Sequence, residues 1–220
     1  MFIQNGMATY NKKRIDKQQL KEKVAQVAAV AFMQKGIKNV KMDDVAAELG
    51  ISKRTLYELF SDKEELLLDV VKLHRKEMKN YMISVAEKAE NVLEIIMSFY
   101  IRTTEDFQTT NILFFEEIKK YPQVTKFLEE GRKENAVSAV AFYKKGVEQG
   151  IFREDVNYEI VQEMIHGQMD MLIHNDIRKT YSMVEIFKTV VFMHLRGITT
   201  EKGLSIVDEF LEQMNELHKN

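Results

Sequence analysis

The chain of 220 residues contains no cysteine, one proline and only nine glycines. Without cysteine it can form no disulfide bond, no thiolate metal site and no cysteine nucleophile. Proline and glycine interrupt helices most strongly, so their scarcity predicts long helices and little sheet. No apolar run approaches the roughly 18 residues that a membrane-spanning helix needs, and the first residues lack the order of charged and apolar segments of a secretion signal. We therefore expect a cytoplasmic, all-α protein with no membrane partner.

The charge is divided unevenly along the chain, although the formal total is only -2. Residues 10–57 contain eleven basic and five acidic side chains, a formal charge of +6, which leaves -8 for the remainder. Partner binding depends on the local field more than on the total charge. The basic segment therefore indicates a surface for an acidic polymer, attached to an acidic body.

Capping residues and apolar residues at helical spacing predict a succession of helices. The first begins near Asp16 and ends at Gly36, short helices follow at 42–49 and 53–60, and Ser61 caps a long helix. The later helices are predicted over 91–109, 111–120, 122–149, 157–176, 182–197 and 202–218. The prediction is about nine or ten helices, with a three-helix helix-turn-helix DNA-binding domain at 10–61 and a larger helical effector-binding and dimerisation domain at 62–220.

Residues 42–61 have the features that a helix-turn-helix requires. Two short helices that cross closely need a small residue, which Ala46 supplies, and a turn with positive φ, which Gly50 supplies. The shared core needs inward-facing apolar residues from both helices, here Val45, Leu49, Ile51, Leu56 and Leu59. The outward positions of the second helix are then Lys53, Arg54, Thr55, Tyr57 and Glu58.

The outward face of this second helix carries groups that suit DNA. Lys53 or Arg54 can donate to guanine O6 and N7, and Thr55 can contact a base edge or a thymine methyl group. Tyr57 is placed for a phosphate oxygen, a contact without sequence information. Lys63 stands in the first turn of the next helix, where a cation opposes the helix dipole, so we assign it to a phosphate as well.

Residues 17–71 resemble the DNA-binding domain of TetR/AcrR-family transcriptional regulators, through the stretch VAAVAFMQKGIKNVKMDDVAAELGISKRTLYELFSDKEELL. The resemblance implies a homodimer on a palindromic operator, usually a repressor released by a small molecule, with no cofactor. It also implies a four-helix dimer interface made by the helices near 157–176 and 182–197 of both subunits.

One position departs from the family's pattern. Members commonly have Thr or Ser at the start of the short helix, whereas this chain has Lys41, which cannot accept hydrogen bonds from the first N–H groups. Lys41 can still reach a phosphate through its long stem. Together with Ser52, the N-cap of the second helix, it completes the predicted DNA-binding residues.

Residues 97–174 are rich in methionine and aromatic side chains, most of which we expect in the core. Such residues also line adaptable pockets, so a subset is predicted to enclose a small, largely apolar effector. Tyr100, Arg102 or His166 would supply its polar contacts. The predicted pocket residues are Met97, Tyr100, Arg102, Phe114, Phe142, His166 and Met169.

A metal-binding or helical-bundle interaction protein without a DNA role is the alternative. His166, Asp170 and His174 share a helix face at a spacing that suits metal ligands. Glu163 and His166 form half of a di-iron pattern, but the sequence contains no second Glu-x-x-His. No P-loop, Rossmann glycine pattern or G-x-S-x-G motif is present, so an enzyme is not expected and no metal site is assigned.

Overall fold

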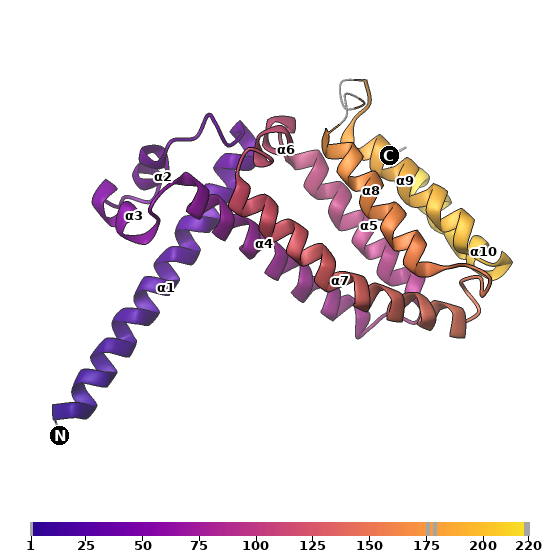
Figure 1. The fold of residues 1–220 in the computed structure, drawn as a ribbon, viewed down its shortest axis with the longest axis horizontal. Helices are drawn as coiled ribbons and strands as arrows, with labels where there is room; N and C mark the ends of the chain where they lie inside the picture. The colour runs from indigo at the N-terminus through magenta and orange to yellow at the C-terminus, as the bar shows by residue number, and fades with distance from the viewer. Residues whose placement is uncertain (1, 175–176, 178–179, 218–220) are drawn as a thin grey trace. The chain divides into compact units, whose positions relative to one another are not determined.

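A computed structural model describes residues 2–174, 177 and 180–217 of the chain. These residues form ten α-helices, and their only β interaction is an isolated bridge between Phe152 and Thr199 (Figure 1). The helices belong to two compact units: unit 1 is Met1–Met78 with Thr110–Phe127, and unit 2 is Lys79–Thr109 with Leu128–Asn220. The predicted all-α class and number of helices are confirmed. No helix in the described part of the chain is long and apolar enough to cross a bilayer.

Unit 1 is built around the second half of its first helix, with the two short helices beside it (Figure 1). Its complete helices are α1 (Phe2–Lys35), α2 (Met42–Glu48), α3 (Lys53–Leu59) and α6 (Ile112–Ile118). It also contains the beginnings of α4 (Lys63–Ala86) and α7 (Pro122–Glu148). The short helices thus lie at the predicted places, within about one residue at each end.

Two predicted helix starts are wrong. The first helix begins at Phe2 rather than near Asp16, because the preceding residues contain no proline and a potential cap can equally stand inside a helix. The cap of α4 is Asp62 rather than Ser61, since Asp62 Oδ1 accepts the Glu65 amide at 2.9 Å. The Glu65 carboxylate in turn accepts the Ser61 amide at 2.7 Å, which lowers the pKa of Glu65.

The core of unit 1 follows helical spacing. Val24, Ala28 and Phe32 of α1 are almost fully buried, together with Leu56 of α3 and Leu66 of α4. Removing a leucine or phenylalanine side chain completely from water contributes about 1.5–3 kcal/mol. These residues therefore hold the short helices firmly against α1 and fix the direction in which the opposite face of α3 points.

Helix α6 returns the chain to unit 1 and fastens the end of α1. The Asn111 amide donates to the Met33 carbonyl at 2.7 Å, and the buried Glu117 carboxylate accepts the Lys38 amide at 2.7 Å. Both contacts join residues more than 75 positions apart along the chain. The loop that leads into α2 is thus held by a segment that enters from far along the sequence.

Unit 2 packs α5 (Val92–Thr109) against α9 (Met183–Ile198) and α10 (Glu201–Leu217), and it also contains α8 (Tyr158–His174) (Figure 1). Aromatic rings dominate its core. Tyr100 stacks on Phe187 with ring centroids 5.6 Å apart and meets Phe192 edge-on at 5.1 Å. Such pairs add about 0.5–1.5 kcal/mol beyond the area they bury.

Near its C-terminal end, α7 is in close contact with the segment that precedes α8. Phe152 is 1% exposed, and its ring lies directly over Gly146. A Cβ atom at position 146 would stand 2.1 Å from Phe152 Cδ2, far inside the van der Waals distance. Only glycine therefore allows the ring to pack on the helix at this point.

Candidate nucleic-acid interface

A Schellman turn joins α2 to α3. The Ile51 amide donates to the Ala46 carbonyl at 3.0 Å and the Gly50 amide to the Ala47 carbonyl at 3.1 Å, while Gly50 has φ +64°. These two bonds satisfy carbonyl groups that the end of α2 would otherwise leave unpaired. Ala46 is 2% exposed and Leu56 fully buried, as the helix-turn-helix pattern requires. The turn sets the angle at which α3 leaves α2.

The start of α2 is capped by an acidic residue instead of the missing Ser or Thr. Asp44 Oδ2 accepts the Lys41 amide at 2.9 Å, and the Lys41 side chain makes no capping bond. The exposed Lys41 side chain is therefore not needed for the helix start. Asp43 and Asp44 also stand in the first turn, where negative charge favours the helix dipole.

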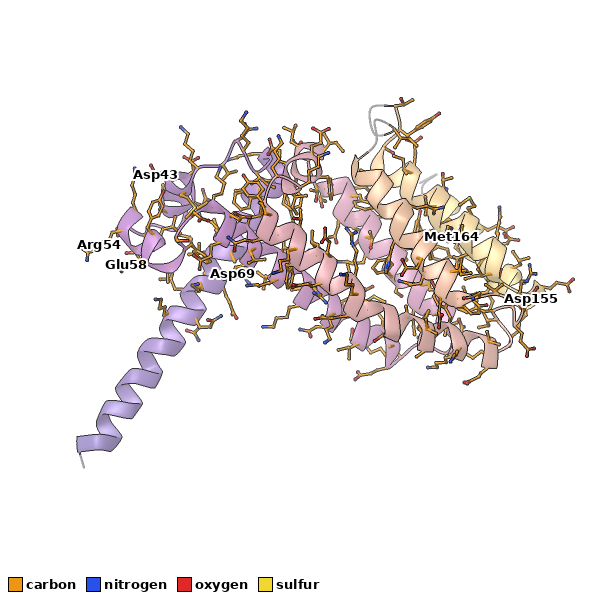
Figure 2. All side chains as sticks on the ribbon, viewed as in Figure 1. Asp43, Arg54, Glu58, Asp69, Asp155 and Met164 are labelled. Carbon is orange, nitrogen blue, oxygen red and sulfur yellow. The ribbon has the colours of Figure 1, made fainter. Side chains whose placement is uncertain are left out.

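The N-terminal turn of α3 faces outward. Ser52 Oγ accepts the Thr55 amide at 3.0 Å and shares a second hydrogen bond with the Thr55 hydroxyl at 2.8 Å. The side chain of Arg54 is 88% exposed and meets Glu58 one turn later at 2.9 Å, a hydrogen bond that raises the pKa of Arg54 (Figure 2). Tyr57 is half-exposed on the same helix.

Lys53 forms the second ion pair of this surface. Its ammonium group donates to Asp43 Oδ2 of α2, and this hydrogen bond raises the pKa of Lys53. Both partners are largely exposed. Exposed ion pairs contribute little to stability, so a stronger anionic partner can take both Lys53 and Arg54 from their carboxylates. Both Lys53 and Arg54 carry a positive charge at neutral pH, because these hydrogen bonds raise their pKa values.

Lys63 has a structural contact that the sequence did not indicate. Its ammonium group donates to the Ile37 carbonyl at 3.0 Å and lies 3.4 Å from the Lys38 carbonyl. Partial burial lowers its pKa, an effect that the nearby Glu117 carboxylate opposes. Lys63 thus ties the start of α4 to the loop before α2. An ammonium group has three hydrogens, so one remains for another acceptor.

Unit 2 contains a cavity of about 320 Å³ between α5, α7, α8 and α9. Phe142 is the predicted pocket residue that lines it, and His166 contacts it indirectly through a 2.8 Å hydrogen bond with Gln162. Met97 and Tyr100 belong to the adjoining core, and the Tyr100 ring stacks on Phe187, a lining residue.

The remaining predicted pocket residues lie elsewhere. Arg102 is exposed and stands 3.9 Å from Glu105 and Asp106. Phe114 is buried in unit 1. The side chain of Met169 lies outside the described residues, as do those of Asp170 and His174 from the metal hypothesis. Among the side chains that are described, no group of three potential metal ligands is found.

Thr103 and His194 are lining residues that the sequence analysis missed. His194 lies on α9 within an apolar series that includes Phe187, Val191 and Ile198. These residues share a helix face, since they recur at steps of three or four. A histidine inside such an apolar stripe was the available signal, although a core histidine gives the same pattern.

Known proteins resemble the chain over both units. A model of the bacterial regulatory proteins of the tetR family matches residues 25–70. The uncharacterized HTH-type transcriptional regulator YvaF of Bacillus subtilis is 28% identical over 173 residues, which are 77% of this chain and 90% of YvaF. The HTH-type transcriptional repressor KstR2 of Mycolicibacterium smegmatis is 23% identical over 150 residues, which are 66% of this chain and 73% of KstR2.

Solved structures share the fold. A TetR-family transcriptional regulator from Agrobacterium tumefaciens superimposes with a TM-score of 0.65 at 15% identity, over 84% of this chain and all of that one. The matched family segment contains α2, the Schellman turn and α3. The family model thus matches the segment that exposes Lys53 and Arg54, and the solved structure shares the fold over most of the chain.

Proposed function

This chain belongs to the TetR family of bacterial regulatory proteins and is a DNA-binding transcriptional regulator, and we propose that it acts as a homodimeric repressor on a palindromic operator. The observation that carries the proposal is the outward N-terminal turn of α3, with Lys53 and Arg54 exposed beyond the Schellman turn. Helices that enter the major groove contact bases from this turn.

The residues of this surface divide by role in the proposal. Arg54 or Lys53 donates to guanine, and Thr55 contacts a neighbouring base edge or methyl group. The other predicted residues, Lys41, Ser52, Tyr57 and Lys63, contact phosphates and set the position of the protein on the duplex. Exposure of Lys41, Ser52 and Tyr57 supports this division, and Lys63 keeps one hydrogen for a phosphate.

Dimerisation is proposed through α8 and α9. Large apolar side chains are exposed on both helices: Ile160 is 57% exposed, and Met164 and Met193 are each 54% exposed. Apolar surface of this kind is stabilised when a second copy covers it. Two recognition helices about 34 Å apart then face successive turns of the duplex, which doubles the number of base pairs recognised.

Release by a small molecule is proposed as a population shift. The molecule would occupy the cavity of unit 2 and favour one arrangement of the helices around it. Helix α4 has residues in both units, so its course along the chain couples such a change to the helix-turn-helix. The coupling requires that the molecule bind the two arrangements with different affinity.

Binding of the full chain to random double-stranded DNA at several salt concentrations tests the proposal. The logarithm of the association constant should fall linearly with the logarithm of the salt concentration, because phosphate contacts release counterions. A helical-bundle interaction protein would show no such binding. Absence of DNA binding even at low salt, or a strictly monomeric mass at micromolar concentration, would contradict the proposed function.

A further inference from the structure

The cavity of unit 2 has the size of a small-molecule site. Its volume of about 320 Å³ lies at the lower end of the range for such sites, roughly 300–1,000 Å³. Four helices line it, namely α5, α7, α8 and α9. A tight core would leave no void of this size, so the packing of these helices is consistent with an occupant.

The walls of the cavity are mainly aromatic and aliphatic. Phe187 meets Phe107 edge-on, with ring centroids 5.3 Å apart, and meets Phe99 at 6.4 Å. Ile165 and Val191 add aliphatic surface. None of the lining residues within the described part of the chain carries a formal charge at neutral pH. The walls therefore favour apolar groups and offer no partner for an ion.

Polar side chains interrupt this apolar lining, and among them Gln162 is already paired with His166 at 2.8 Å. Thr103 of α5 and His194 of α9 both line the cavity, and Thr103 Oγ1 and His194 Nδ1 are buried without a hydrogen-bond partner. A buried polar atom left unpaired is unfavourable, so each of these atoms needs an external partner. A threonine hydroxyl and a neutral imidazole can each donate or accept.

His194 is neutral at physiological pH. Burial lowers its pKa below the ordinary value of 6.5, and the nearby Val190 backbone partly opposes the shift, although its geometry does not make it a hydrogen-bond partner of Nδ1. A neutral imidazole supplies a hydrogen bond and no charge. An anionic or cationic ligand would thus lie among apolar side chains without a counter-ion, which is strongly unfavourable in a site of this kind.

We propose that this cavity binds a neutral, mainly aromatic or hydrocarbon molecule that carries one hydroxyl or carbonyl group, held by hydrogen bonds to His194 and Thr103. The inference rests on the proposed function, in which a small molecule acts through unit 2. It adds the chemical class of that molecule and the two residues that orient it.

Three probes that share one ring system test the class of ligand. 2-Naphthol is neutral and has a hydroxyl group, naphthalene has no polar group, and 2-naphthoate is an anion. Calorimetric titration of the full chain at pH 7.5 should give about tenfold tighter binding of 2-naphthol than of either other probe, since one net hydrogen bond corresponds to about a factor of ten. Equal or tighter binding of 2-naphthoate, or no binding of any probe, would overturn the proposal.

Two substitutions test the residues. In His194→Phe and in Thr103→Val, which is nearly isosteric, 2-naphthol should lose about five- to tenfold in affinity, while naphthalene should change less than about threefold. Thr103→Val alone decides the matter if the His194 variant does not fold. An equal loss for both probes in Thr103→Val would show that the residue only shapes the cavity and would contradict its assigned role.

DNA binding by the same preparations separates this inference from the proposed function. If the probes fail while the salt-dependent binding to random DNA is present, the ligand class is wrong and the regulator function stands. If DNA binding is absent, the proposed function is wrong whatever the probes do. Selective binding of 2-naphthol supports the ligand class assigned to the cavity in either case, because the titration contains no DNA.

Discussion

The two units handle their polar groups in opposite ways. On the surface of unit 1, three polar contacts join close neighbours along the chain: the Lys41 amide with Asp44, Ser52 with Thr55, and Arg54 with Glu58. Inside unit 2, Thr103 and His194 line a cavity with polar atoms that have no partner in the protein. A surface of loosely paired ions suits a large polyanion, whereas isolated polar atoms in an apolar cavity suit a small neutral molecule.

The packing of unit 2 can be broken while the recognition surface stays intact. Gly146→Ala should lower the free energy of unfolding by about 3 kcal/mol, because the new methyl group would stand 2.1 Å from Phe152 Cδ2. Gly167→Ala in α8 is the matched control, since nothing lies within 4 Å of its Cβ position. It should stabilise the helix by about 0.5–1 kcal/mol. Denaturant unfolding of both variants checks the pair, and an unchanged Gly146 variant would show that Phe152 packs elsewhere.

Removing a recognition cation should alter binding and leave stability unchanged. Arg54→Ala should weaken binding to the preferred DNA site by about 10- to 100-fold and relax base preference, with a smaller effect on random DNA. Glu58→Gln is the control, because it removes the negative charge 2.9 Å from Arg54 and should leave DNA binding equal or tighter. Competition between the preferred site and random DNA measures the ratio of the two affinities for each variant. Equal losses on the two DNAs would assign Arg54 to phosphate.

The Schellman turn links the stability of unit 1 to its geometry. Gly50→Ala should cost about 1–2 kcal/mol, because a residue with a Cβ atom is strained at φ +64°. Gly50→Asn should recover part of this loss, since asparagine tolerates the left-handed region better. Chemical denaturation ranks the three proteins. Alanine and asparagine variants of equal stability would mean that the turn relaxes to another conformation.

Lys63 distinguishes a structural contact from a phosphate contact. Lys63→Ala should weaken binding to all DNA alike and also lower the stability of unit 1 by about 1 kcal/mol, because the hydrogen bond to the Ile37 carbonyl is lost. Thermal unfolding without DNA isolates the second effect. If DNA binding weakens while the unfolding temperature is unchanged, Lys63 contacts phosphate and contributes nothing to the stability of unit 1.

The smallest expected effect concerns the cap of α4. The hydrogen bond from the Ser61 amide lowers the pKa of Glu65 from its ordinary value of 4.5. A carboxylate whose pKa is lowered by folding stabilises the fold fully at a pH above its unfolded-state pKa. This contribution is lost as the pH falls through the folded-state pKa. Glu65→Gln should therefore be slightly less stable than the parent at pH 7, and the difference should shrink at acidic pH. A stability difference between parent and variant that does not change with pH would show that the charge of Glu65 does not contribute to the stability of the cap.

The helix-turn-helix could be predicted because its rules are local. Gly50, Ser52 and the buried Leu56 each act within a few residues, and the sequence places them in the order that the turn requires. The helices of unit 2 were located by the same spacing rules. The start of α1 was missed because a residue such as Asp16 can cap a helix or continue one.

The lining of the cavity could not be predicted, since it depends on contacts between helices far apart in sequence. Phe114 and Phe142 are the same residue type, yet Phe114 is buried in unit 1 and Phe142 lines the cavity of unit 2. His194 stands where an apolar residue would fit the helix pattern equally well. The contact between Lys63 and the Ile37 carbonyl could not be predicted, because only the folded core brings that carbonyl, 26 residues earlier, to the ammonium group.

Selection of bound sequences from a random double-stranded DNA library tests the central claim most directly. The full chain should enrich a palindrome whose two half-sites lie about one helical turn apart, since a homodimer presents two α3 helices related by symmetry. The Arg54→Ala variant should lose the same base preference in both half-sites. Enrichment of a single unpaired half-site, or of no sequence, would contradict the account.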